Sequence, residues 1–84
     1  MKTFRHISKI MKRARLDAQI SQKELAAHLG YISPQMISNW ERELCGPPMD
    51  AVKASIKYLN VNKAQIKAAL IKDYEADLDE GLRG

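Results

Sequence analysis

The sequence has almost no cysteine, few aromatic residues, little glycine and no long hydrophobic run. Cys45 stands alone, so no internal disulfide can form. With the two scattered histidines, His6 and His28, it matches no familiar spacing of metal ligands. No apolar run approaches the roughly 18 residues that span a bilayer, and residues 1–10 mix basic with apolar side chains instead of forming a signal-peptide core. We therefore expect a cytoplasmic protein with no cofactor, metal or membrane partner.

The composition that remains is typical of a small helical protein. Hydrophobic residues make up 45% of the chain and charged residues 29%, with many Ala, Ile, Leu and Lys, which favours helices in a folded domain. At 84 residues there is room for one domain, which we assign to residues 1–84. A chain of this length buries only about 60% of the surface that it exposes when unfolded. We expect an all-α fold with a small core.

Positive charge is concentrated at the start of the chain. Residues 1–30 contain seven basic and two acidic side chains, whereas residues 61–84 contain four basic and five acidic ones. The formal net charge of the whole chain is +4. A basic front half with a mildly acidic tail favours a nucleic-acid partner, although basic helices are often only solvated surfaces.

Capping signals and apolar spacing delimit the first three expected helices. Apolar residues at spacings of three and four place the first over about 3–17. A capping box, Ser21–Glu24, opens the second, and Gly30 ends it. Ser33 is the expected N-cap of the third, with Pro34 in its first turn.

Two more helices are expected after the break at Gly46–Pro48. The fourth has apolar residues at spacings of three and four: Met49, Val52, Ile56 and Leu59. Asn62 caps the fifth, which together with an acidic tail ending at Gly84 occupies about 62–84. The fifth helix carries an apolar residue at every fourth position: Ile66, Leu70, Tyr74 and Leu78. This stripe either closes the core or also forms a dimer seam.

The second and third helices, over about 21–43, have the pattern of a helix-turn-helix: two short helices joined by a tight turn that contains Gly. Their sequence, SQKELAAHLGYISPQMISNWERE, closely resembles the helix-turn-helix of the Cro and phage-repressor (XRE-like) family. The likeness extends from about Ile10 to Val61. It implies a lambda-repressor-like domain, a compact bundle of about five helices.

The resemblance also assigns roles to single residues. Arg15 resembles the arginine of the family's first helix, and Glu41 its partner in a partly buried structural ion pair. Two departures from the family pattern are present: the turn Gly30–Ser33 is one residue longer, and Glu43 stands where a Gly is usual. We expect the third helix to continue to about Glu43 or a little further.

The third helix is the expected DNA-reading element. A recognition helix places its N-terminal part in the major groove, where a side-chain amide bonds an adenine through N6 and N7. Gln35 and Asn39, four residues apart, share one helix face and form the expected base-reading pair. The residues expected to border them are Pro34, Met36 and Ser38. The residues expected to contact phosphates are Gln22, Lys23, Ser33 and Arg42.

We therefore predict a sequence-specific regulator of transcription, a repressor, that binds double-stranded DNA. We expect an inverted-repeat operator and a homodimer, at least on DNA. An enzyme is disfavoured because the sequence offers no nucleophile with its base, no paired carboxylates in a cleft and no phosphate loop. The alternative is a protein-interaction module with the same fold, such as an antitoxin or a transcriptional adaptor, which the acidic final segment would suit.

Overall fold

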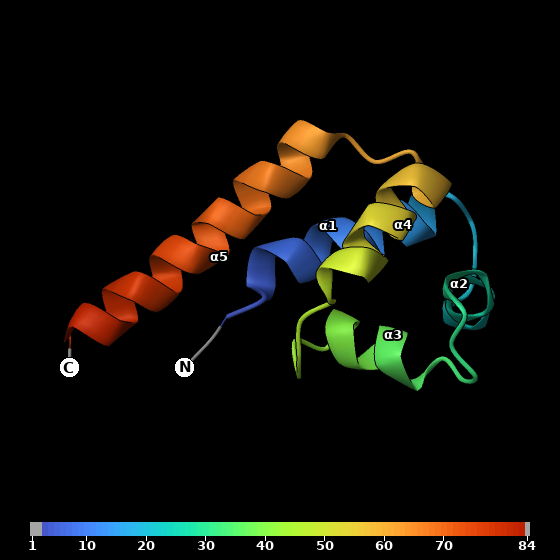
Figure 1. The fold of residues 1–84 in the computed structure, drawn as a ribbon, viewed down its shortest axis with the longest axis horizontal. Coiled ribbons are helices and arrows are strands. Elements are labelled where there is room, and N and C mark those ends of the chain that lie inside the picture. Colours follow the sequence, from blue (N-terminus) through green and yellow to red (C-terminus); the bar gives the residue numbers. More distant parts are fainter. Residues whose placement is uncertain (1–2, 84) are drawn as a thin grey trace.

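The computed structural model describes residues 3–83, which form five α-helices and no strand. The helices are α1 (Arg5–Asp17), α2 (Gln22–Leu29), α3 (Gln35–Glu41), α4 (Met49–Leu59) and α5 (Lys63–Arg83). The expected all-α, five-helix fold is confirmed. Figure 1 shows α2 and α3 at one end of the molecule, with the long α5 extending away from them. Met1, Lys2 and Gly84 lie outside the described residues. The expected end of the acidic tail, at Gly84, is therefore not described.

Two clusters of buried apolar side chains hold the helices together. The first lies within the helix-turn-helix and under α4, and contains Leu25, Ala26, Ile37, Trp40 and Ala51. The second joins α1, α4 and α5, and contains Ile7, Met11, Val52 and Ile66. Because α4 contributes neighbouring residues to both clusters, it links the helix-turn-helix to the α1–α5 pair. Burial of each large side chain contributes about 1.5–3 kcal/mol.

Local sequence signals position α2 as expected. The Ser21 hydroxyl accepts a hydrogen bond from the Glu24 backbone N–H at 3.0 Å, and the Glu24 carboxylate accepts one from the Ser21 N–H at 3.1 Å. Gly30 ends the helix with a φ of 87°. Only glycine adopts this left-handed conformation without steric cost, so the chain turns here toward α3. The predicted capping box and helix end are confirmed.

The expected extension of α3 to Glu43 is wrong. The helix ends at Glu41, and Glu43 has a φ of 62°. The Glu43 N–H donates to the Trp40 carbonyl at 3.1 Å, and the Leu44 N–H donates to the Asn39 carbonyl at 2.9 Å. These bonds close the helix in the left-handed conformation that usually belongs to glycine. A non-glycine residue adopts it at a cost of roughly 1–2 kcal/mol.

Only the first half of the expected apolar stripe on α5 closes the core. Ile66 is buried and Leu70 is partly buried, but Tyr74 is 67% exposed and Leu78 is also exposed. The buried side of α5 continues through Asp73 instead. The acidic residues expected to form a tail belong to this helix as well, which continues to Arg83.

Asp73 is buried because it caps α1, which has no side-chain cap of its own. Its Oδ1 accepts from the His6 backbone N–H at 2.9 Å and from His6 Nδ1 at 2.8 Å. Its Oδ2 accepts from the Ile7 N–H at 3.0 Å. The first N–H groups of a helix lack partners inside the helix and carry a partial positive charge, so an acidic side chain is favoured there. The α5 helix is thus fixed to the start of α1 by a carboxylate.

We predict that Asp73→Ala lowers the free energy of unfolding by about 1–2 kcal/mol, because it leaves backbone N–H groups of α1 without an acceptor. Urea denaturation of the variant measures this loss. Glu75→Ala, an exposed change on the same helix, is the matched control and should stay within about 0.5 kcal/mol of the unmodified chain. Equal stability of the two variants would contradict the capping role of Asp73.

Candidate nucleic-acid interface

The exposed face of α3 is set by the residues that anchor its other face. Ile37 and Trp40 are buried against α2 and α4. Gln35, two residues before Ile37 and on the opposite side of the helix, is exposed, and Asn39 is partly exposed. Because the anchoring residues fix the rotation of α3, its polar face is directed to solvent. The structure therefore places the predicted base-reading pair on one accessible surface.

The polar side chains of this face are bonded to one another. Gln35 Nε2 donates to Asn39 Oδ1 at 2.9 Å, and Arg42 Nη2 donates to the same oxygen at 3.1 Å. We call these three residues, Gln35, Asn39 and Arg42, the amide network. Sequence reasoning placed the first two on one face but missed the contact with Arg42. The i, i+3 spacing of Asn39 and Arg42 is the sequence signal that could have revealed this contact.

The residues expected to border the reading pair surround this network. Pro34 and Met36 are exposed, and Ser38 is partly buried. Ile32, in the turn before α3, is fully exposed, and sequence reasoning did not select it.

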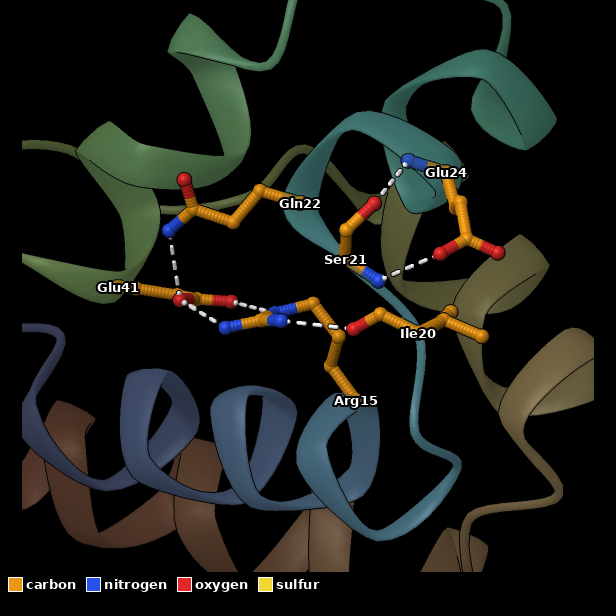
Figure 2. Close-up of polar contacts among 6 residues, drawn as sticks. All are labelled: Arg15, Ile20, Ser21, Gln22, Glu24 and Glu41. Atoms are coloured by element: carbon orange, nitrogen blue, oxygen red, sulfur yellow. Dashed lines mark hydrogen bonds and ion pairs between the residues drawn. The ribbon is translucent and has the colours of Figure 1, made fainter.

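The ion pair between Arg15 and Glu41 joins α1 to α3. Arg15 Nε lies 2.6 Å from Glu41 Oε2, and Arg15 Nη2 lies 3.0 Å from Oε1, so the pair is bidentate. The two side chains are only 9% and 5% exposed. Arg15 Nη1 also donates to the Ile20 carbonyl at 2.8 Å, which ties the link before α2 into the same group (Figure 2).

Gln22 takes a different position from the one expected for a phosphate contact. Its Nε2 donates to Glu41 Oε1 at 2.9 Å, so the side-chain amide is turned toward the buried carboxylate, as Figure 2 shows. Lys23 and Ser33 are exposed, and the Ser33 hydroxyl accepts from the Gln35 N–H at 3.4 Å. Of the four predicted phosphate contacts, Gln22, Ser33 and Arg42 therefore have side chains that already bond to other residues.

The environment of Glu41 stabilises its charged form. Burial by itself would raise its pKa, but hydrogen bonds from Arg15 and Gln22, together with the positive charges of Arg15 and Lys12, outweigh that effect. The pKa of Glu41 therefore lies below its ordinary value. A carboxyl group whose pKa falls on folding stabilises the native state above its unfolded pKa of about 4.3, and this contribution is lost as the pH falls through the folded value.

The fold and this surface define a helix-turn-helix protein, and the comparison with known families agrees. A family model described as Helix-turn-helix matches residues 11–66, which include the second half of α1, all of α2, α3 and α4, and the first turn of α5. The chain belongs to this family, the Cro and C1-type (XRE) helix-turn-helix proteins. No curated protein and no solved structure gives a significant match.

Membership of the family makes the chain a DNA-binding helix-turn-helix regulator, in a family whose members typically are not enzymes. Within residues 3–83, none of the helices combines the length and the apolar character that crossing a bilayer requires.

We predict that Glu41→Ala lowers the free energy of unfolding by about 3 kcal/mol or more near neutral pH, because Arg15 remains buried without a partner. Chemical denaturation of both single variants and of Arg15→Ala/Glu41→Ala measures the coupling. Strictly additive losses would contradict a stabilising ion pair. The Glu41→Gln variant has no carboxyl group to titrate at this position. Its free energy of unfolding should therefore fall less between neutral pH and pH values below about 4.3 than that of the unmodified chain.

Proposed function

We propose that the protein is a sequence-specific transcriptional repressor that inserts α3 into the major groove of its operator. The observation that supports this most strongly is the amide network on the face of α3 opposite the buried Ile37 and Trp40. A major groove is wide enough for an α-helix, and side-chain amides match the donor and acceptor pattern of adenine there.

In this proposal the base contacts come from the face of α3 that carries Gln35 and Asn39, bordered by Pro34, Met36 and Ser38. The side chains of Lys23, Ser33 and Arg42 contact the phosphate chain, and Gln22 contacts it through its backbone. The side chain of Gln22 bonds to Glu41, so its backbone N–H in the first turn of α2 is the group that we assign to a phosphate. Such contacts set the register of the protein on DNA but carry no sequence information.

We further propose that two copies bind an inverted repeat, with α5 at the dimer seam. The supporting observation is a groove of about 580 Å³ between α4 and α5, beside several exposed apolar side chains. Those side chains are Met49, Ile71, Tyr74, Leu78 and Leu82. Pairing of such a face with its copy gives a two-fold dimer, and a two-fold dimer matches a palindromic site.

We predict that selection from random duplexes enriches an inverted repeat whose half-sites lie about one helical turn, roughly 34–36 Å, apart. The purified chain at moderate salt serves for the selection, followed by footprinting on the enriched site. A protected single half-site without symmetry would contradict the dimer. Flat enrichment would contradict repression of a specific operator and would favour a protein-interaction module, with the apolar face of α5 as its contact surface.

We predict that Gln35→Ala weakens binding to the selected site by about 1–3 kcal/mol and changes non-specific binding little, because it removes a base contact. Lys23→Ala, the matched change at a phosphate contact, should weaken specific and random duplexes by similar factors and reduce the slope of log affinity against log salt by about 1. Titrations at several salt concentrations measure both. Equal losses on specific and random duplexes for Gln35→Ala would contradict base reading.

A further inference from the structure

The amide network on α3 assigns different tasks to its three members. Within the proposed DNA-reading function, on which this inference rests, we propose that Arg42 and Asn39 are positioning residues that fix the orientation of the Gln35 amide. Gln35 then reads an adenine, and Asn39 does not read a base in bidentate fashion.

Arg42 determines whether the oxygen or the nitrogen of each amide takes part in the hydrogen bonds of the network. An amide's oxygen and nitrogen are distinguished only by their partners. A guanidinium group can donate hydrogen bonds but cannot accept them. The Asn39 atom 3.1 Å from Arg42 Nη2 must therefore be the oxygen, Oδ1. The Gln35 atom that contacts the same oxygen at 2.9 Å must then be its nitrogen, Nε2.

This polarity leaves Gln35 ready to bind adenine and Asn39 unable to do so. An amide oxygen has two lone pairs, and both on Asn39 Oδ1 are occupied by Gln35 and Arg42. Asn39 cannot also accept the adenine N6 hydrogen while these bonds persist. Gln35 keeps a free Oε1 and a second hydrogen on Nε2, which match adenine N6 and N7. The side chain is exposed, so a base can approach it.

The network also prepares Gln35 for binding before DNA arrives. A free glutamine side chain loses much rotamer freedom when it is ordered at an interface. The bond to Asn39 restricts that freedom in the unbound protein, and Arg42 in turn restricts Asn39. Arg42 therefore contributes to specificity in addition to any contact with the phosphate chain.

Loss of Arg42 has a defined consequence for the bases that Gln35 accepts. Without that donor, the Asn39 amide is free to rotate and present Nδ2 to Gln35, which then turns its Oε1 inward. Gln35 would present only N–H donors to the groove. Guanine, with acceptors at both O6 and N7, accepts such donors, whereas adenine offers one acceptor and one donor. The preference for adenine over guanine should therefore weaken.

Three variants separate positioning from reading and from charge. Arg42→Met removes the guanidinium group that donates to Asn39 Oδ1. Asn39→Asp keeps an oxygen that accepts from both Gln35 and Arg42 but removes the Nδ2 donors. Lys23→Met removes one positive charge from an exposed residue of α2 and is the matched control for lost charge. Each variant is titrated with the selected duplex and with duplexes altered one base pair at a time, at fixed salt.

We expect Arg42→Met to lose about tenfold of the adenine-over-guanine preference at one base pair in each half-site, a loss of the size expected for a disturbed bidentate base contact. Lys23→Met and Asn39→Asp should bind all duplexes more weakly but keep the same preference at every position. A profile for Arg42→Met that matches Lys23→Met would overturn the proposal. Loss of preference in Asn39→Asp would also overturn it, because Asn39 would then read a base through Nδ2.

The amide network can also be tested in the free protein, independently of DNA binding. In ¹H–¹⁵N spectra of the free chain, the side-chain amide signals of Gln35 and Asn39 should shift in Arg42→Met and stay in place in Lys23→Met. Unchanged signals in Arg42→Met would refute the network. Absence of any preferred duplex for the unmodified chain would instead refute the proposed function, with the fold and the amide signals intact.

Discussion

The carboxylate of Glu41 is the constraint on which the rest of the proposed DNA-binding surface depends. A charge buried to this degree needs partners, because an unpaired buried ion is strongly unfavourable. Glu41 obtains them from Arg15 on α1 and Gln22 on α2, while Arg15 also holds the Ile20 carbonyl. One acidic side chain near the end of α3 thereby fixes that helix to two other helices.

The length of α3 explains why this anchoring matters. The helix has seven residues, and isolated helices shorter than about 12–15 residues are marginal in water. Its stability comes from the packing of Ile37 and Trp40 and from the Glu41 ion pair on the inner side. Because the inner side anchors the helix, the outer side can carry polar residues that are available for hydrogen bonding, such as Gln35 and Asn39. Rigid anchoring and a polar outer face are what a recognition helix needs to place side chains within about 0.5 Å of a productive geometry.

Features set by neighbouring residues were predictable from the residues themselves, whereas features set by distant residues were not, apart from the Arg15–Glu41 ion pair that the family resemblance implied. The Ser21–Glu24 capping box and the turn at Gly30 depend on local backbone groups, and both are present. The burial of Asp73 depends on unpaired N–H groups at the start of α1, 66 or 67 residues away, so apolar periodicity along α5 could not reveal it. At the site, helical spacing placed Gln35 beside Asn39, but the inward turn of Gln22 depends on where α3 places Glu41.

The most direct test of the account is to map which backbone amides of the labelled chain change their NMR signals when the selected duplex is added. We predict that the changes concentrate in the N-terminal half of α3 and the first turn of α2, and that the exposed face of α5 changes only where two copies meet. Changes confined to α5, with the signals of Gln35, Asn39 and Lys23 unmoved, would contradict insertion of α3 into the major groove.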